Sequence, residues 1–475
     1  MKQKEEKTRG ETLEKRLGYK RRCFWEIADE QEKKQAFNLA EEYRKFLYKG
    51  KTEREVVNIT KAILEENEFH SLTLKGENHN KFYRINHNKN VAIAVLGKED
   101  ISNGVNLIVA HIDSPRVDLK QQPLYEEKET KLALLHTHYY GGIKKYQWMS
   151  IPLSLHGIVI KEDGSKVEVV IGEKHDDPVF TFADLLPHLA KNEQYSKKLA
   201  EAIPAEKLRL LFGSIPFTDE KVKDKVKLNI LTILEEKYGI KEEDLISAEM
   251  EIVPAFKVND VGLDRSMIGG YGHDDRICAY SALQAILGQN NPKRTSVVFL
   301  ADKEEIGSEG NTGAKSQFIK DFIYDLIKLT NKDSYDVLTK TLMNSKVLSG
   351  DVNAGVNPCF VNVHEKQNAA HIGFGVCLTK FTGSRGKSSS NDANAEFVGE
   401  IRALFNKYSV NWQTGELGKV DEGGGGTIAQ FMALYGASVI DCGPPILAMH
   451  SPYEIASKAD LYSTYKGYKI FLQFA

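Results

Sequence analysis

The strongest constraint on the fold is a short apolar run, residues 296–300, that leads into two adjacent glutamates, Glu304 and Glu305. A run of this length, rich in β-branched and aromatic side chains, is typical of a buried strand in a parallel sheet. Open α/β sheets bind ligands at the carboxyl ends of such strands. One glutamate can bind a metal ion while its neighbour moves a proton, as metal-assisted hydrolysis requires. Adjacent glutamates are also common on solvated surfaces, so the pair alone does not decide the matter.

The length and charge of the chain argue against several classes of protein. At 475 residues it is expected to form two or three domains, one of which can interrupt another. A net charge of -2 gives no global electrostatic argument for binding nucleic acid or an anionic membrane. We find no signal peptide and no apolar run of the roughly 18 residues that a membrane helix needs. The cysteines are dispersed without C-x-x-C spacing, which fits reduced thiols and predicts a cytoplasmic protein.

The pattern of helices and strands indicates an α/β domain in both halves of the chain. Residues 25–70 are expected to be helical, because Thr52 and Glu55 form a capping box before an apolar stripe. A nearly all-apolar strand at 105–110 then places His111 just beyond the edge of the sheet. The same pattern resumes in the second half of the chain, where a strand carries the glutamate pair. We therefore predict a mostly parallel central sheet.

The region 120–256 differs in character from its surroundings. Short alternating apolar runs separated by turn residues indicate antiparallel hairpins, and segments rich in Lys and Glu at helical spacing follow them. The histidines of this region have no accompanying carboxylate cluster with ligand-like placement. We predict a discontinuous domain formed by 1–119 and 257–475, interrupted by an inserted domain at 120–256 that serves assembly or access. A continuous single domain is the alternative.

Two histidines and several carboxylates follow predicted strands or turns, where rigid scaffolds present binding residues. This set suits two divalent ions of the zinc, cobalt or manganese kind, with one carboxylate shared between them. Asp113 is placed to accept the second N–H of the His111 imidazole and so to fix its tautomer. Ligands so far apart in sequence cannot be assigned from spacing, and scattered polar loop residues are the alternative. The candidates are His111, Asp274, Glu304, Glu305, Asp351 and His450.

Five short motifs occur in the order and context of the aspartyl aminopeptidase family, and the chain resembles that family over nearly its whole length. The family belongs to the clan of two-zinc exopeptidases. The resemblance implies a three-layer α/β/α catalytic domain with a mostly parallel sheet, interrupted by an inserted β-rich dimerisation domain. Each motif alone is weak, but five in order are specific. The motifs are Ala110-His111-Ile112-Asp113-Ser114-Pro115-Arg116, Gly272-His273-Asp274-Asp275-Arg276-Ile277, Asp302-Lys303-Glu304-Glu305-Ile306-Gly307-Ser308, Ser349-Gly350-Asp351 and Ala448-Met449-His450-Ser451.

The resemblance also implies how the candidates share two metal ions per subunit. Asp274 would bridge both ions, which are expected to be zinc, with cobalt or manganese as alternatives. His111 and Asp351 would complete one site. Glu305 and His450 would complete the other. The peptide bond that follows Asp274 is expected to be cis, as in the family.

The implied activity is hydrolysis of the bond after the N-terminal residue of a peptide. Glu304 would act as the general base that takes a proton from water and passes it to the leaving amine. An acidic N-terminal residue, Asp or Glu, needs a cation, and Lys380 and Arg385 are candidates in a basic loop. His188 is a further candidate, reaching a neighbouring subunit's site. The stretch after Asp351 lacks the histidines common in the family, which argues against strict preference for acidic residues.

The resemblance implies a homo-oligomer built from dimers, with a dodecamer as one candidate assembly, acting on peptides and on neither nucleic acid nor membrane. His273 stands where the family usually has an apolar residue, and we expect a turn histidine with a satisfied hydrogen bond. One alternative function is a related two-metal deacylase or carboxypeptidase. The other is an inactive scaffold or peptide-binding particle. Retention of Glu304 and of every implied ligand argues against the scaffold.

Overall fold

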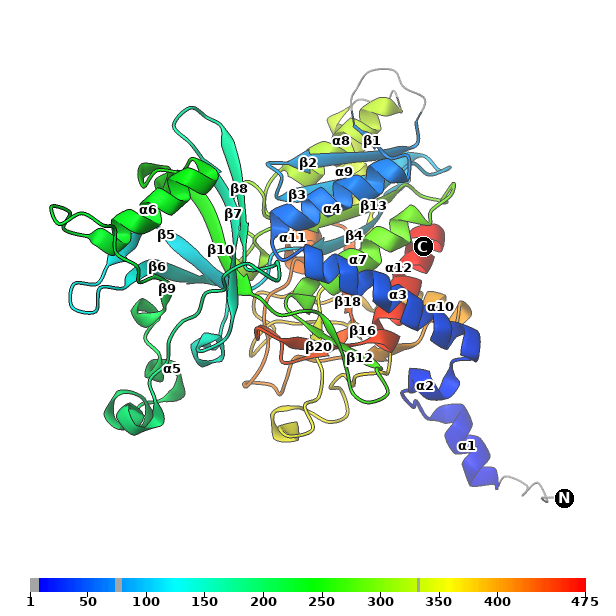
Figure 1. Ribbon diagram of the computed structural model, residues 1–475. Helices are drawn as coiled ribbons and strands as arrows, with labels where there is room; N and C mark the ends of the chain where they lie inside the picture. The colour runs from blue at the N-terminus through cyan, green and yellow to red at the C-terminus, as the bar shows by residue number, and fades with distance from the viewer. Residues whose placement is uncertain (1–7, 73–78, 331–333) are drawn as a thin grey trace.

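The structure is a computed structural model that describes residues 8–72, 79–330 and 334–475. It has a mixed α/β fold with three β-sheets (Figure 1). The largest sheet has nine strands. In spatial order they are β1 (His70–Ser71), β2 (Lys81–Asn86), β3 (Asn90–Val95), β13 (Ser296–Ala301), β4 (Asn106–His111), β14 (Lys346–Ser349), β18 (Ser438–Gly443), β16 (Val376–Thr379) and β17 (Trp412–Thr414).

The four central strands of this sheet, β13, β4, β14 and β18, run parallel. Their side chains alternate between two apolar cores, one on each face of the sheet. In β13, Val298 and Leu300 belong to one core, whereas Val297 and Phe299 belong to the other. Such a strand is buried on both faces, which explains its continuous apolar sequence. The predicted buried parallel strand at 296–300 is confirmed.

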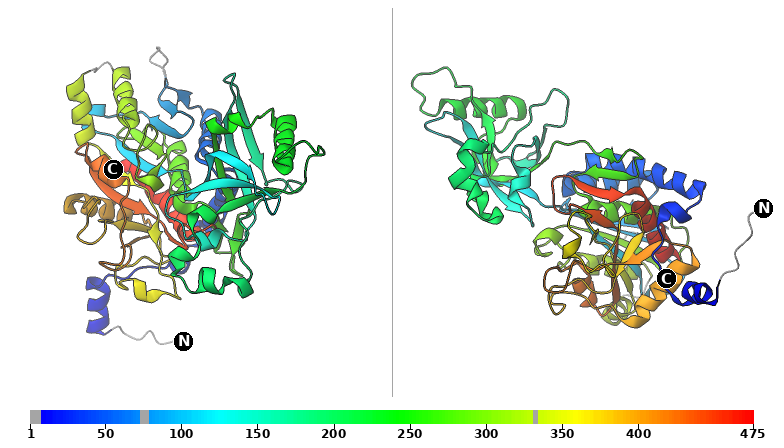
Figure 2. Two further views of the ribbon diagram at one scale, coloured as in Figure 1. Left: turned by 90° about the vertical axis from the view of Figure 1, so that its left-hand side faces the viewer. Right: turned by 90° about the horizontal axis from the view of Figure 1, so that it is seen from below.

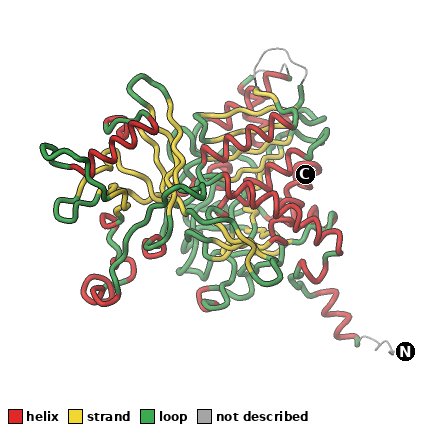
Figure 3. Tube along the Cα trace, viewed as in Figure 1, coloured by secondary structure: helices red, strands yellow, loops and turns green. Residues whose placement is uncertain are grey.

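Helices pack on both faces of the nine-stranded sheet (Figure 3). The helix α4 begins as the sequence predicts, because Thr52 accepts the N–H of Glu55 and the Glu55 side chain returns the bond. None of the helices in the described segments has the length and apolar character that crossing a membrane requires. One face carries α3 (Glu30–Lys49), α4 (Glu53–Glu66), α7 (His273–Leu287), α10 (Ala395–Lys407) and α12 (Lys458–Phe474). The other carries α8 (Phe318–Leu329), α9 (Tyr335–Met343) and α11 (Ala429–Ala433).

A six-stranded sheet stands to one side of this body (Figures 1 and 2). All of its strand pairs are antiparallel, which confirms the hairpins expected in this part of the chain. The helix α6 (Lys225–Tyr238) packs against it, and the short α5 (Leu199–Ala202) lies further out. Its strands are, in order, β8 (Lys166–Ile171), β7 (Leu153–Ile160), β10 (Ala248–Pro254), β5 (Arg116–Glu126), β6 (Ala133–Tyr140) and β9 (Arg209–Gly213).

A third, mixed sheet of five strands lies beside the carboxyl ends of the central strands and contributes loops to the site described below. In order its strands are β11 (Asn259–Val261), β12 (Met267–Gly270), β20 (Glu454–Ser457), β19 (Pro445–Leu447) and β15 (Asn353–Ala354).

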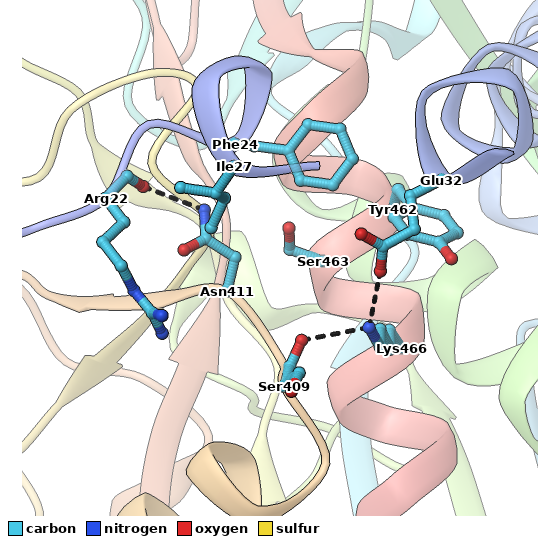
Figure 4. A pocket seen from close by; sticks show the side chains of 9 residues that line it. All are labelled: Arg22, Phe24, Ile27, Glu32, Ser409, Asn411, Tyr462, Ser463 and Lys466. Carbon is cyan, nitrogen blue, oxygen red and sulfur yellow. Dashed lines mark hydrogen bonds and ion pairs between the residues drawn. The ribbon is translucent and has the colours of Figure 1, made fainter. Parts of the chain in front are cut away.

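The N-terminal segment, with α1 (Arg9–Leu17) and α2 (Phe24–Ile27), reaches the C-terminal helix α12. A small cavity of about 210 Å³ lies at this contact (Figure 4). Inside it, Lys466 donates to the Glu32 carboxylate at 2.8 Å and to the Ser409 carbonyl at 3.0 Å. These two hydrogen bonds link α12 to α3 and to the segment that follows α10.

Buried charges join the six-stranded sheet to the start of α4. On β7, His156 Nδ1 lies 2.7 Å from Glu55 Oε1, and Nε2 lies 3.1 Å from Glu173 Oε1. Lys51 Nζ contacts the same Glu173 oxygen at 2.6 Å. His156 thus has two carboxylate partners, one of which, Glu55, is remote in sequence. Burial opposes protonation, but the hydrogen bonds to Glu173 and Glu55 outweigh it and raise the pKa of His156.

We expect His156→Gln to destabilise the protein most at acidic pH. A histidine whose pKa is raised in the folded state stabilises the fold fully below its unfolded pKa of about 6.5. That contribution is lost as the pH rises through the higher pKa of the folded state. Urea unfolding of both proteins between about pH 6 and pH 9 should give a difference in unfolding free energy of about 2 kcal/mol at the acid end, which then shrinks. A difference that grows with pH would contradict this.

Candidate metal centre

The predicted ligands meet at the carboxyl edge of the central parallel strands. His111 is the last residue of β4 and pairs with Ala301, so the strand extends one residue beyond the predicted end. The glutamate pair lies in the turn η7 (Glu304–Ile306) after β13, and Asp351 follows β14. Because parallel strands end at one edge, residues far apart in sequence are neighbours here.

Two further candidates come from other elements. Asp274 lies at the start of α7, where the backbone departs from helical geometry, and the Asp274-Asp275 peptide bond is cis, as the resemblance implies. His450 lies in the loop between β19 and β20 of the five-stranded sheet. The candidate ligands thus lie at the ends of regular elements or, for Asp351 and His450, in short connections next to them, which rigid elements hold in place.

The Asp274 carboxylate lies between the two histidines. Its Oδ1 is 3.2 Å from His111 Nε2, and its Oδ2 is 3.1 Å from His450 Nε2. Glu305 Oε2 is 3.5 Å from His450 Nε2. Ligand atoms that all lie within 4.8 Å of one another form two overlapping groups, His111 with Glu304 and Asp351, and His111 with Asp274 and Glu305.

The chemistry of this cluster fits divalent cations. Asp274 Oδ1 and Glu305 Oε1 are buried and accept no hydrogen bond within the described part of the chain. Burial, reinforced by neighbouring carboxylates, raises the pKa of Glu305 and of Asp351 well above the ordinary range. Ionised carboxylates gathered in this way require a compensating cation. A set of imidazole nitrogens and carboxylate oxygens suits zinc, cobalt and manganese.

Asp113 is a fully buried carboxylate that orients the glutamate pair. Its Oδ1 accepts the backbone N–H of Glu304 at 3.1 Å, and its Oδ2 accepts that of Glu305 at 3.2 Å. His111 Nδ1 lies 3.0 Å from the backbone oxygen of Asp113 and 3.4 Å from Oδ1. The carbonyl is therefore the nearer partner of the imidazole, and the expected carboxylate is the more distant one.

Glu454 on β20 is a buried carboxylate that sequence reasoning missed. It accepts the backbone N–H of Asp274 at 3.0 Å and that of His450 at 2.7 Å, so it ties together the main chains of two candidate ligands. Burial, together with the Asp274 charge, raises its pKa to about 8. Its position four residues after His450 is a local signal that sequence reasoning can use.

Two more contacts come from the six-stranded sheet, and no motif indicated them. Tyr140 donates its hydroxyl to Asp113 Oδ2 at 2.8 Å. The backbone carbonyl of Gly142 lies 2.8 Å from His450 Nδ1. Both are contacts between segments remote in sequence, so only the folded chain reveals them.

A cavity of about 400 Å³ opens beside the cluster. The glycines at 424–426 form one part of its wall. Another part is formed by Glu304 and by every candidate ligand except His111, namely Asp274, Glu305, Asp351 and His450. Among the described residues, no Lys or Arg lines it. Lys380, a candidate for binding an acidic side chain, instead lies 3.5 Å from Asp392, and Arg385 belongs to the same loop outside this lining. The other lining side chains are neutral: Val352, Asn353, Thr382, Leu417, Thr427, Gln430, Phe431 and Met449.

Two other histidines lie away from the cavity. His188 is exposed in the turn η3 (Pro187–Leu189). His273 is buried, its Nδ1 lies 2.8 Å from the Tyr43 hydroxyl, and burial lowers its pKa to about 3. The expected hydrogen bond is present at Nδ1, but His273 is the first residue of α7 and not a turn residue.

Comparison with known proteins gives the family. The family model of the aminopeptidase I zinc metalloprotease (M18) matches residues 46–472. The chain belongs to the M18 family of aminopeptidases. M18 is the aspartyl aminopeptidase family, so the resemblance read from the five motifs is confirmed.

Relatives of this M18 family chain match it over nearly its full length. A protein of Clostridium acetobutylicum named "Probable M18 family aminopeptidase 1" is 50% identical, covering 94% of this chain and 97% of that protein. One of the same name from Thermotoga maritima is 51% identical, covering 92% and 95%. A crystal structure of an M18 aminopeptidase from Thermotoga maritima superposes with a TM-score of 0.91 at 47% identity, covering 96% of this chain and all of that one. The chain is thus a metallopeptidase of the aminopeptidase type.

Proposed function

We propose that this aminopeptidase removes N-terminal residues from peptides with two divalent ions held by the cluster, zinc foremost, with cobalt or manganese as alternatives. His111 and Asp351 would hold one ion, Glu305 and His450 the other, and Asp274 would bind both. The observation that carries this proposal is the orientation of the Asp274 carboxylate. One of its oxygens faces each histidine, at 3.2 Å and 3.1 Å, as a bridging ligand requires.

Glu304 is the proposed general base. Bound ions would lower the pKa of a water molecule and polarise the scissile carbonyl. Glu304 lines the cavity, and Asp113 fixes its backbone through the N–H bond at 3.1 Å. Burial raises the pKa of Glu304 to about 7. From this position in the cavity wall the carboxylate is proposed to take a proton from water and return it to the leaving amine.

The cavity favours a peptide with a free amino group and a neutral N-terminal side chain. The carboxylates of the cluster attract the positive α-amino group, which supports an aminopeptidase over a carboxypeptidase or a deacylase. An acidic side chain would meet no Lys or Arg among the described lining residues, and a buried charge without a partner costs several kcal/mol. We therefore expect neutral N-terminal residues of the substrate to be preferred over Asp or Glu. Lys380 and Arg385, the candidate partners of an acidic residue, do not line the cavity.

The domain organisation and the assembly are also part of the proposal. We infer a three-layer α/β/α catalytic domain from residues 1–119 and 257–475, and an inserted dimerisation domain at 120–256. The segment 179–217 exposes many apolar side chains, and a stable monomer seldom does so. A yeast relative of 23% identity is described as a dodecamer. We propose that this chain also forms an assembly built from dimers. In that assembly His188 would reach the metal centre of a neighbouring subunit. The exposed apolar residues are Val179, Leu185, Leu186, Leu189, Tyr195, Leu199, Ile215 and Phe217.

A cytoplasmic location is proposed from the thiols. All five cysteines are free, and Cys278, Cys377 and Cys442 are buried. Unpaired thiols in such number fit a reducing compartment.

A panel of aminoacyl substrates, assayed with zinc, cobalt or manganese, tests the proposed function. We expect release of neutral N-terminal residues with kcat/KM at least about tenfold higher than for Asp or Glu, a difference of about 1.4 kcal/mol or more. N-acylated substrates should not be cleaved. Cleavage of N-acylated or C-terminal bonds would indicate the deacylase or carboxypeptidase instead. Protein that binds no divalent ion and gains no activity from any of the three would indicate the scaffold.

A further inference from the structure

One segment of the six-stranded sheet reaches the metal centre. Tyr140 is the last residue of β6, and Gly141 and Gly142 follow it directly. These three residues contact the candidate ligands and their supporting groups, although the other strands of this sheet lie to one side of the body (Figures 1 and 2). The Tyr140 hydroxyl and the Gly142 carbonyl are directed at Asp113 and at His450, so these residues act on the metal centre through others.

Tyr140 supports the carboxylate that orients the glutamate pair. Its hydroxyl donates to Asp113 Oδ2 at 2.8 Å, the same oxygen that accepts the Glu305 N–H. The Arg116 guanidinium covers the Tyr140 ring at 3.9 Å from the ring centroid. Arg116 is fixed in turn by Asp118, whose Oδ1 accepts from its Nε at 2.8 Å. The tyrosine is therefore held in one orientation, and so is the carboxylate that it contacts.

Gly142 fixes the ring of His450. Its backbone carbonyl accepts a hydrogen bond from His450 Nδ1 at 2.8 Å. A proton held on Nδ1 leaves Nε2 with its lone pair free, and Nε2 is the atom that faces Asp274 and Glu305. An outer hydrogen bond of this kind sets both the tautomer and the orientation of a ligating histidine.

The two glycines lie close against candidate ligands. Gly141 has a φ of +71°, and a Cβ atom there would stand 3.3 Å from Glu305 Cβ and 3.4 Å from its Oε2. At Gly142 a Cβ atom would stand 3.2 Å from His450 Nδ1. Side chains at these positions would push on two candidate ligands, and the positive φ disfavours any residue other than glycine at the first.

We propose that residues 140–142 are a positioning segment for the metal centre, supplied by the six-stranded sheet. The proposal rests on the proposed function, because it assumes that Glu305 and His450 bind metal. The segment orients Glu305 through Asp113 and orients His450 through the Gly142 carbonyl. The six-stranded sheet then has a role in the chemistry in addition to any role in assembly, since the geometry of the ligands depends on it.

Two substitutions with matched controls test this inference. Tyr140→Phe removes only the hydroxyl, and Tyr139→Phe makes the same change at the exposed neighbouring position. Gly141→Ala adds a methyl group beside Glu305. Gly164→Ala adds one at a similar φ of +79° in the same region, with no atom within 4 Å of it. Backbone strain is therefore common to both glycine variants, and only Gly141→Ala disturbs a ligand.

Zinc affinity from competition with a chelator, the visible spectrum of the cobalt-loaded protein, and the separate kcat and KM values are the readouts. We expect Tyr140→Phe and Gly141→Ala each to weaken zinc binding about 10- to 100-fold, to shift the cobalt spectrum and to lower kcat with little change in KM. Both controls should match the wild type in all four quantities.

Wild-type zinc affinity and cobalt spectra in both test variants would overturn the inference and leave the proposed function intact. If one variant fails to fold, the other decides, because the two substitutions act at different atoms. A wild-type protein that binds no zinc would instead refute the proposed function, on which the inference rests.

Discussion

Glu304→Gln should slow peptide hydrolysis at least about a hundredfold while the protein still binds zinc. Glutamine has the size of glutamate and keeps the backbone N–H that Asp113 accepts at 3.1 Å. Its side-chain amide cannot take a proton from water at neutral pH, so the step assigned to this residue is lost. Steady-state kinetics should show the loss in kcat, since the side chain is not proposed to bind the substrate.

A surface glutamate supplies the control for this variant. Glu309→Gln makes the same change at an exposed side chain, and we expect wild-type turnover from it. Zinc content of each protein is measured alongside the kinetics. Unchanged turnover in Glu304→Gln would remove Glu304 from the role of general base. Loss of zinc in that variant would indicate that Glu304 is a metal ligand. This outcome is informative because Glu304 lies in one ligand group with His111 and Asp351.

Asp274→Ala should abolish both zinc binding and activity. This residue has one carboxylate oxygen directed at each of the two histidines, so its removal deprives both proposed sites of a ligand. Loss of a residue that only hydrogen-bonds to a ligand lowers metal affinity about 10- to 100-fold. Loss of a ligand shared by both sites should therefore lower zinc affinity more than about a hundredfold. Titration with zinc, followed by calorimetry or by competition with a chelator, measures the effect.

The matched control for this second variant is Asp176→Ala, at an exposed loop position. It should bind zinc as the wild type does. An Asp274→Ala protein that retains wild-type zinc content and affinity would mean that the metal lies elsewhere. Full activity in that variant would contradict the proposed shared site directly.

Features with a strong local signal were predictable from the sequence. The apolar run at 296–300 is a buried parallel strand, and the capping box of Thr52 with Glu55 starts a helix. Both depend on neighbouring residues, so a single sequence carries the information. The strand before His111 was predicted to end one residue too early. His111 itself pairs with Ala301 of the adjacent strand β13, and this pairing depends on the tertiary fold.

The site depended on more than local pattern. Ligands that extend from His111 to His450 carry no spacing signal, and their roles were implied only by resemblance to a family. Tyr140 and Gly142 were missed because their contacts join segments whose proximity is decided by the tertiary fold. Glu454 was missed although it lies four residues after His450, and its contact with Asp274 again depends on the tertiary fold.

Charge alone was a poor guide to substrate binding. The basic loop with Lys380 and Arg385 suggested a partner for an acidic substrate, but neither residue lines the cavity. Lys380 is paired with Asp392 instead. A basic residue near a site in sequence is often neutralised by a local carboxylate.

Diffraction from crystals grown with zinc, recorded at the zinc absorption edge, tests the central claim most directly. The account predicts two anomalous peaks in contact with the Asp274 carboxylate, one beside His111 and one beside His450. An active crystal form with no zinc peak between these histidines would contradict it.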